Sequence, residues 1–352
     1  MTAGLLGTKL ILVEGLPGCG KSSMAQYICD QLWRNGHQSR WIYEEEEPHP
    51  VAPPGRISDF ETTDAYSRSL LNRWRSFASE ADQSDEITIL EARFFQDVIF
   101  GFLRDDTERQ TILDHVKDAG DICGPLRPVL IYFYQPDNAT TMRRICDARG
   151  ARMEQFYINR NQSDLYGRRH HLTGFDGLVR FWLDVRHVID QLLIELAVPV
   201  LSVDISDQLW PNYQEQVGAF LSLPQRRNEA LDAPAYLKTF EGVYAYRQKA
   251  PMRRVGGRKR PDQFLDREFR IRIAEGRLTM HNYGRLWPIN RLLPKETDTF
   301  YLASWPFEME FERDEDGIVR SATRTNPNGR WLVTSQIYPR VGDLENEQTC
   351  DS

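Results

Sequence analysis

Paired cysteines are missing from this 352-residue sequence. Its five cysteines stand far apart and none forms a CxxC pair: Cys19, Cys29, Cys123, Cys146 and Cys350. A disulfide framework and a structural zinc site both need cysteines at short, regular spacings. The scattered set therefore argues against both, and it favours the reducing cytoplasm as the location.

Long apolar runs and a strong positive charge are missing as well. No stretch reaches the roughly 20 apolar residues of a membrane span. The first fifteen residues are interrupted by Lys9 and lack a small-residue cleavage site, so they predict neither a signal peptide nor an anchor. The formal net charge of -7 argues against a generic nucleic-acid binder. We therefore expect no membrane and no nucleic acid among the partners, and the sequence leaves the oligomeric state open.

The first part of the chain alternates apolar runs with helical periodicity. A helix is predicted through about Leu32, and the clearest amphipathic pattern runs from Leu178 to Leu196. Strands that alternate with helices predict an α/β fold with a doubly wound parallel sheet. The predicted strands cover residues 9–14, 39–43, 87–90, 129–134 and 200–204.

The pattern changes after a linker at residues 224–234. We expect a first domain at 1–223 and a small antiparallel β-barrel or sandwich at 235–345, without a convincing helix. Residues after Ala233 hold 20 basic and 17 acidic side chains, so this part carries a charge of +3 and the rest -10. The basic run Arg253–Arg260 is predicted to be a solvated loop, and a docking site for an acidic partner or for the first domain is the alternative. Trp287, Trp305 and Trp331 are predicted to be barrel core rather than a ligand cage. The predicted strands cover residues 242–246, 269–273, 277–281, 299–303, 308–312, 318–325 and 331–336.

A phosphate-binding loop follows the first predicted strand. The segment from Gly15 to Ser22 matches GxxxxGK[ST], and it lies between a strand and a helix as the motif requires. Glycines let successive N–H groups curl around a phosphate, Lys21 can reach the β- and γ-phosphates, and the Ser22 hydroxyl can bind Mg²⁺. The sequence therefore predicts ATP and Mg²⁺ as cofactors. The predicted nucleotide-binding residues are Gly15, Leu16, Pro17, Gly18, Cys19, Gly20, Lys21, Ser22 and Ser23.

Phosphoryl transfer also needs a carboxylate near Mg²⁺, a base and further cations. Glu91 ends the third predicted strand and is our candidate for the metal ligand, and Arg93 follows it as a candidate cation. The acidic run Glu44–Glu47 is either a solvated turn or the source of a base, with Glu47 as the preferred member. Either Glu47 or Glu91 would take the acceptor's proton. The acceptor itself is expected to be a small molecule.

A basic segment at 149–169 is predicted to be a lid over the phosphates, and a basic surface loop is the alternative. Arg149 and Arg152 are the candidates to reach the γ-phosphate, because a lid must both exclude water and balance charge. His170 and His171 have no spaced partners, so no metal role is expected for them. Cys19 is expected to be a small filler in the loop, although the helix N-terminus beside it could lower its pKa.

These residues resemble the nucleoside and nucleotide monophosphate kinases, thymidylate kinase and the deoxynucleoside kinases in particular. The run ILVEGLPGCGKSS carries the likeness, and Glu14 stands before the first glycine as in that family. The resemblance implies a catalytic Glu-Pro at Glu47-Pro48, a counterpart of Glu-Arg-Ser at Glu91-Ala92-Arg93 with the arginine one place late, and a lid at Arg149–Glu154. It covers about residues 9–222.

The second part has its own likeness. Phe240-Glu241-Gly242-Val243-Tyr244 and the turns after it look like the lipocalin-like β-domain of some serine β-lactamase-type hydrolases, which implies no chemistry of its own. Three functions stay open at this point. The first is a kinase that phosphorylates a small metabolite, either nucleoside-like or of another kind. The second is an NTP-hydrolysing switch that binds partners through the β-domain. The third is a nucleotide-binding protein that has lost catalysis.

Overall fold

The computed structural model divides the chain into two compact units. One holds Met1–Glu45 and His49–Arg226, and the other holds Glu46–Pro48 and Arg227–Ser352. Glu47, the preferred candidate base, lies outside the residues that the structure describes. The described residues are 7–46, 48–226, 230–245, 252–255, 258–261, 268–274, 276–281, 289–303, 305, 307–325 and 336–343.

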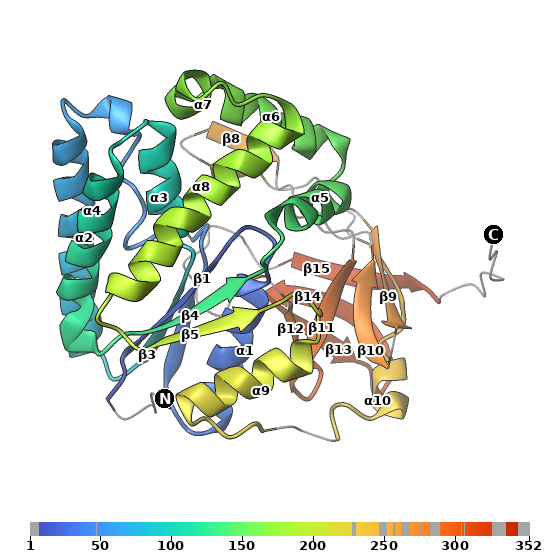
Figure 1. The fold of residues 1–352 in the computed structure, drawn as a ribbon. Coiled ribbons are helices and arrows are strands. Elements are labelled where there is room, and N and C mark those ends of the chain that lie inside the picture. Colours follow the sequence, from blue (N-terminus) through green and yellow to red (C-terminus); the bar gives the residue numbers. More distant parts are fainter. Residues whose placement is uncertain are drawn as a thin grey trace. The chain divides into compact units, whose positions relative to one another are not determined.

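The first unit is built on a five-stranded parallel sheet in the order β2-β3-β1-β4-β5 (Figure 1). The predicted α/β fold with a parallel sheet is therefore confirmed, and each predicted strand is found within one residue at either end. β1 lies in the centre and is buried along its whole length, because it pairs with β3 on one side and β4 on the other. The strands are β1 Leu10–Gly15, β2 Ser39–Ile42, β3 Ile87–Glu91, β4 Val129–Tyr134 and β5 Val200–Asp204.

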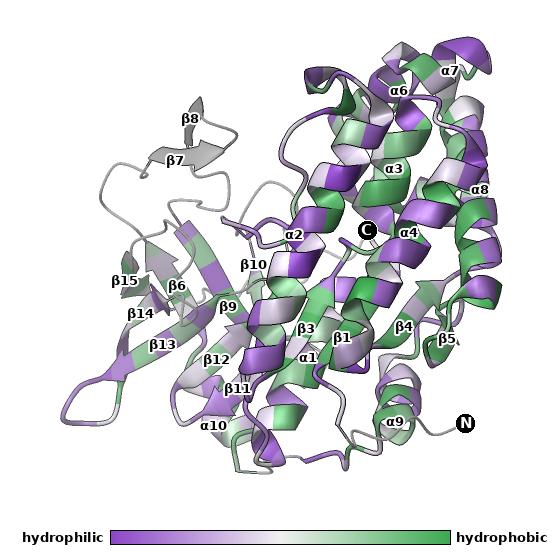
Figure 2. Ribbon diagram, turned by 90° about the vertical axis from the view of Figure 1, so that its left-hand side faces the viewer, coloured by the Kyte–Doolittle hydropathy of each residue, from purple (hydrophilic) through white to green (hydrophobic). Residues whose placement is uncertain are grey.

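Helices cover both faces of this sheet. One large core lies between the sheet and the group α2, α3, α4 and α8, while α1 packs against the strands from the other face (Figure 1). Figure 2 shows that the strands are largely hydrophobic and that the helices have one hydrophobic and one hydrophilic face, as a sheet covered by helices requires. The helices are α1 Lys21–Arg34, α2 Thr63–Gln83, α3 Gln96–Arg104, α4 Arg109–Cys123, α5 Asn138–Arg149, α6 Ala151–Ser163, α7 Leu165–Arg169, α8 Gly174–Glu195 and α9 Trp210–Leu221.

The second unit contains a closed antiparallel barrel in the order β10-β11-β12-β13-β14-β15-β6-β9. Its interior is filled by side chains, with Phe240 packing against Phe300 and Phe311 at ring-centroid distances of 4.8 and 4.7 Å. The strands are β6 Gly242–Ala245, β9 Glu268–Ala274, β10 Arg277–His281, β11 Ile289–Glu296, β12 Thr299–Leu302, β13 Glu308–Arg313, β14 Val319–Thr325 and β15 Gln336–Gly342.

Three expectations for this unit were wrong. A one-turn helix, α10 at Pro234–Lys238, precedes the barrel where no helix was expected. The basic run is a two-stranded sheet rather than a loop, because β7 Met252–Val255 pairs with β8 Arg258–Pro261. β11 escaped prediction because Pro294 and its charged neighbours hide the alternation, and the pairing shifts register at that proline. Trp305 is buried core as expected, whereas Trp287, Trp331 and residues 331–335 lie outside the described part.

Among the described residues, no helix combines the length and the apolar character that crossing a membrane requires.

Candidate nucleotide-binding site

The phosphate-binding motif lies where the sequence places it, between β1 and α1. Gly15 is the last residue of β1 and Lys21 the first of α1, so the intervening loop opens directly onto a helix N-terminus. The loop's turn needs a left-handed backbone at Gly20, where φ is +87°. A Cβ at Gly20 would also lie 2.2 Å from the indole of Trp210 on α9. Backbone conformation and space therefore both require glycine at this position.

Replacing Gly20 by alanine is expected to destabilise the protein and to weaken nucleotide binding, because the methyl group would collide with Trp210. Gly36→Ala is the matched control, since Gly36 has a similar φ of +85° but nothing within 4 Å of its Cβ position. The control should show only the cost of the backbone strain, about 1 kcal/mol. Thermal unfolding and binding of a fluorescent ATP analogue measure both effects. Equal losses in the two variants would contradict the collision, and Gly20→Ala combined with Trp210→Ala should recover part of the loss.

Lys21 is almost fully buried beside the loop. Its ammonium group donates to the Leu16 carbonyl at 3.1 Å and to Oε1 of Gln96 at 2.8 Å. Burial has the largest influence and lowers the pKa of Lys21, but the acidic groups around it together raise the pKa above its ordinary value. Lys21 is therefore a fixed cation at the helix N-terminus, surrounded by Cys19, Glu44, Glu91 and Glu14.

Ser22 and Glu91 meet at the same end of the sheet. The Ser22 hydroxyl donates to Oε1 of Glu91 at 2.7 Å, and the Trp41 indole N–H donates to Oε2 at 2.7 Å. Glu91 has no exposed surface. Burial first, and then the Glu44 carboxylate, raise the pKa of Glu91 to about 8, against the opposing effects of Ser22, Lys21 and Trp41.

The pair formed by Ser22 and Glu91 fits a Mg²⁺ ligand set. A hydroxyl and a carboxylate oxygen are hard donors, and Mg²⁺ in phosphate sites takes only one or two protein ligands beside phosphates and water. Within the described ranges, no group of three or more His, Cys, Asp or Glu side chains could hold a metal by itself. The residues present therefore suit a metal that arrives with a nucleotide.

Glu14 occupies a position in this site that the sequence did not reveal. Its carboxylate accepts the backbone N–H groups of Phe94 and Phe95 at 2.7 and 3.0 Å, and that of Gln96 at 3.3 Å. Since the Gln96 side chain in turn accepts from Lys21, Glu14 fixes the turn that presents Gln96 to the lysine. The sequence signals were an acidic residue inside the apolar run ILVEG, where a buried charge needs partners, and the likeness to a family with a glutamate before the first glycine.

Burial raises the pKa of Glu14 to about 7, although the three N–H groups and Lys21 oppose the rise. A pKa raised in the folded state contributes stability below the unfolded value, near 4.5, and this stability is lost as the pH rises through about 7. We therefore expect the free energy of unfolding to fall between pH 5 and 8, by an amount on the order of 3 kcal/mol from this group. In Glu14→Gln this part of the slope should vanish. Urea unfolding of both proteins across this range measures it, and parallel slopes would contradict the assignment.

Arg93 and the acidic run lie against each other after β3 and β2. A guanidinium N–H of Arg93 donates to the Glu44 backbone carbonyl. The Glu44 carboxylate acts on the pKa values of both Lys21 and Glu91, so this member of the run faces the loop. Sequence reasoning preferred Glu47, which the structure does not describe; Glu44 is the acid that the structure brings to the site.

The basic segment 149–169 forms helices rather than a loop, and its role as a lid stays a prediction. Arg149 ends α5, its guanidinium donates to the Tyr157 hydroxyl, and Arg152 is exposed at the start of α6. α5 approaches the loop, since a Cβ on Gly18 would lie 2.8 Å from Ile145. Arg149 follows Ile145 by four residues and therefore lies on the same face of α5, one turn further along.

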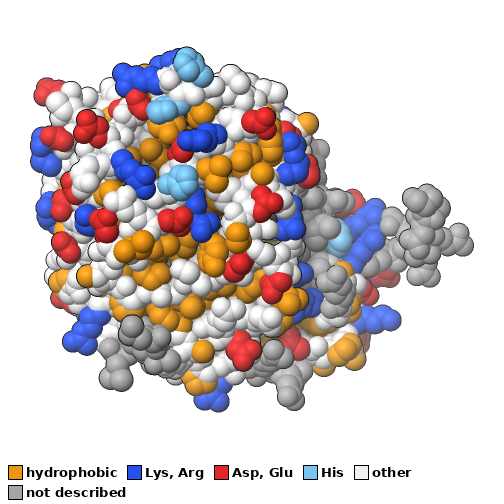
Figure 3. All heavy atoms as spheres, viewed as in Figure 1, with side chains coloured by type: hydrophobic (Ala, Val, Ile, Leu, Met, Phe, Trp, Pro, Cys, Tyr) orange, Lys and Arg blue, Asp and Glu red, His pale blue; other side chains and the backbone are white. Residues whose placement is uncertain are grey.

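The far end of this segment is held by an ionic cluster at α7. Asp106, in the turn after α3, accepts from Arg169 and lies 3.2 Å from the His170 ring. Figure 3 shows Lys, Arg and His side chains gathered over α7. These contacts make His170 part of a surface ionic network.

Cys19 is buried in the loop, as expected of a small filler. Burial raises the pKa of its thiol, and the nearby Lys21 opposes this only in part. The expectation that the helix N-terminus would lower this pKa was therefore wrong, because the side chain points into the protein, where the thiolate is poorly solvated.

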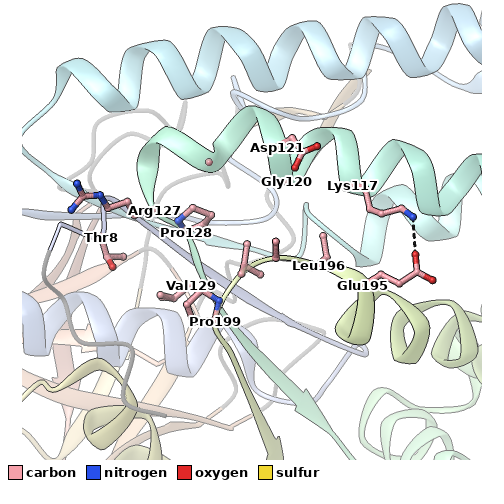
Figure 4. A pocket seen from close by; sticks show the side chains of 13 residues that line it. Thr8, Lys117, Gly120, Asp121, Arg127, Pro128, Val129, Glu195, Leu196 and Pro199 are labelled. Atoms are coloured by element: carbon pink, nitrogen blue, oxygen red, sulfur yellow. Dashed lines mark hydrogen bonds and ion pairs between the residues drawn. The ribbon is translucent and has the colours of Figure 1, made fainter.

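A pocket of about 410 Å³ lies at the amino ends of the strands, opposite the loop (Figure 4). Thr8 precedes β1, Val129 begins β4 and Pro199 precedes β5, so the pocket opens at the amino ends of the strands, whereas the loop follows the carboxyl end of β1. Lys117 and Glu195 form an ion pair of 2.7 Å across it. The pocket is therefore separate from the candidate site.

Similarity to known proteins is found among solved structures rather than among family models or curated sequences. No protein-family model matches the chain, and none of the curated proteins is similar to it. Among solved structures, the chain is similar to the YorR protein of Bacillus subtilis, crystallised in complex with phosphorylated GDP. The match covers 59% of this chain and 92% of that chain at 13% identity, with a TM-score of 0.31.

Proposed function

We propose that the first unit is an ATP- and Mg²⁺-dependent kinase that phosphorylates a small molecule. The observation that carries the proposal is the contact of 2.7 Å between Ser22 and Glu91, next to the buried ammonium of Lys21. A hydroxyl, a carboxylate and a cation at one helix N-terminus are the groups that a bound metal and a transferring phosphate require. The order of the parallel strands around the loop is compatible with a P-loop fold.

In this proposal the loop from Gly15 to Ser23 binds the nucleotide's phosphates. Its N–H groups and Lys21 balance the negative charge that develops on the transferring group. Ser22 and Glu91 would hold Mg²⁺, which supplies charge neutralisation at the phosphate oxygens when bound. Arg93 and the lid arginines Arg149 and Arg152 are proposed as further cations.

The acceptor's hydroxyl or phosphate oxygen attacks the γ-phosphorus as the bond to the β–γ bridging oxygen breaks, and its proton passes to a carboxylate. Glu44 is our preferred base, because its charge is felt at both Lys21 and Glu91. Glu47 stays a candidate from the sequence. Glu91 is better suited to bind the metal than to act as the base, because both its oxygens already accept hydrogen bonds.

The test is ADP release from Mg²⁺-ATP, with and without pooled nucleosides, nucleotides, sugars and amino alcohols. The expected result is one pool that raises the rate at least about tenfold, equivalent to about 1.4 kcal/mol of barrier. Single members of that pool would then identify the acceptor. A slow rate that no pool changes would contradict the kinase and favour a nucleotide switch; binding without any turnover would favour a protein that has lost catalysis.

A further inference from the structure

Trp41 reaches the candidate site from β2, the edge strand of the sheet. It pairs in register with Ile89 of β3, two residues before Glu91, and only 4% of its surface is exposed. Its ring packs edge-on against Tyr43 at a centroid distance of 5.7 Å. Nothing in the local sequence, SRWIYEE, distinguishes this tryptophan from ordinary strand core.

The hydrogen bonds divide the two oxygens of Glu91 between two donors. Oε1 accepts from Ser22, which lies on the nucleotide side, and Oε2 accepts from Trp41 at 2.7 Å. If Ser22 and Glu91 both held a metal, the hydrogen bond between them would be given up. The bond from Trp41 lies on the other oxygen, and it can therefore persist through that change.

Packing alone does not provide a tryptophan with such a partner. Trp182 on α8 is equally buried, at 5% exposed, and lies against Phe100 and Phe181, yet its indole nitrogen has no hydrogen-bond partner in the described structure. The indole of Trp41 instead donates to the one fully buried carboxylate that faces the loop's hydroxyl. A donor fixed by a strand is well suited to orient a metal-binding carboxylate.

We propose that Trp41 is a positioning residue, whose indole N–H holds Glu91 in the orientation that binds the metal of a Mg²⁺–nucleotide complex. This role rests on the proposed function. The charged groups that face Glu91 are the Lys21 ammonium and the Glu44 carboxylate. Glu44 is itself an acid and has no proton to donate when it is ionised, and the hydrogen bonds of Lys21 go to Leu16 and Gln96 rather than to Glu91.

The experiment compares Trp41→Phe with Trp182→Phe in the full-length protein. Phenylalanine keeps an aromatic ring and removes the N–H, and Trp182→Phe makes the same change where the N–H has no partner. Mn²⁺ serves as the probe, and its affinity for the protein with ADP is measured by EPR. Trp41→Phe should lower this affinity about tenfold, as removal of an outer-shell partner does. ADP binding in EDTA should not change, and Trp182→Phe should match the wild type.

A third variant separates donation from packing. Histidine is smaller and more polar than phenylalanine. If Trp41 contributes only packing, Trp41→His should therefore bind Mn²⁺ more weakly than Trp41→Phe. Donation to Glu91 predicts the reverse order for Mn²⁺ affinity, because an imidazole N–H can replace the indole N–H. The concentration of Mg²⁺ that gives half-maximal ADP release should follow the same order.

The outcomes are distinguishable. Wild-type protein that binds no Mn²⁺ with ADP would overturn both this role and the proposed function. Wild-type binding that Trp41→Phe leaves intact would overturn the role of Trp41 alone. The role of Trp41 would also be overturned if Trp41→Phe lost Mn²⁺ affinity and metal-free ADP affinity equally. The same holds if Trp41→His bound Mn²⁺ more weakly than Trp41→Phe.

Discussion

Replacing Lys21 by methionine is expected to lower acceptor-dependent ADP release about 100- to 1,000-fold, the usual loss when one fixed donor to a developing charge is removed. Methionine keeps the buried stem of the side chain and removes only the ammonium, which lies at the N-terminus of α1 and contacts Leu16 and Gln96. The rate is measured by a coupled ADP assay with the acceptor pool that activates the wild type.

Lys9→Met is the matched control. Lys9 lies just before β1, at the amino end of the same strand, and its ammonium pairs with Asp82 on the surface. Its removal should leave the rate unchanged, because a surface ion pair contributes little and this one is far from the loop along the strand. A Lys21→Met variant that folds with the wild-type melting temperature and keeps the wild-type rate would contradict the proposed role of the lysine. Loss of nucleotide affinity with an unchanged rate at saturation would assign Lys21 to binding alone.

The local parts of this site could be predicted from the sequence. The loop, β1 and α1 are consecutive, and glycine spacing, an apolar run and helical periodicity each mark one of them. The parallel sheet followed from alternation of strands with helices, which needs no knowledge of distant contacts. The position of Glu91 at the end of β3 was equally readable, since ITILE is a buried strand that ends in an acid.

The contacts between distant segments could not be predicted. Trp41 and Glu91 are 50 residues apart, and Glu14 lies 82 residues from the Gln96 backbone that it binds. Strand order decides which of these residues meet, and a single sequence does not state it. Within Glu44–Glu47 the sequence offers four identical side chains after β2, and the resemblance drew attention to Glu47, the one before proline. Glu47 lies outside the described residues and stays a prediction, whereas the position of Glu44 near Lys21 and Glu91 comes from the structure.

Glu91→Gln is expected to abolish most metal-dependent activity while leaving the fold intact. A glutamine fits the same hydrogen bonds, since its Oε1 can accept from Trp41 and its amide can donate to the Ser22 oxygen. What is removed is the ability to ionise and to bind a metal as a carboxylate. The rate at saturating ATP should fall by at least about 100-fold, the upper end of the losses seen for outer-shell groups, because Glu91 is proposed to bind the metal directly. ADP release over a range of Mg²⁺ concentrations measures the change.

Glu86→Gln provides the control at the other end of β3, where a half-buried acid precedes the strand and should matter little. Stability separates the charge effect from damage to the fold. Because burial raises the pKa of Glu91 to about 8, its contribution to stability is lost as the pH rises through that value. Glutamine has no such titration, so the stability of Glu91→Gln relative to the wild type should increase as the pH rises from about 5 to 8 and level off above it. A variant that loses activity and stability together at this pH would show that Glu91 supports the fold, and an active one would show that the metal is held elsewhere.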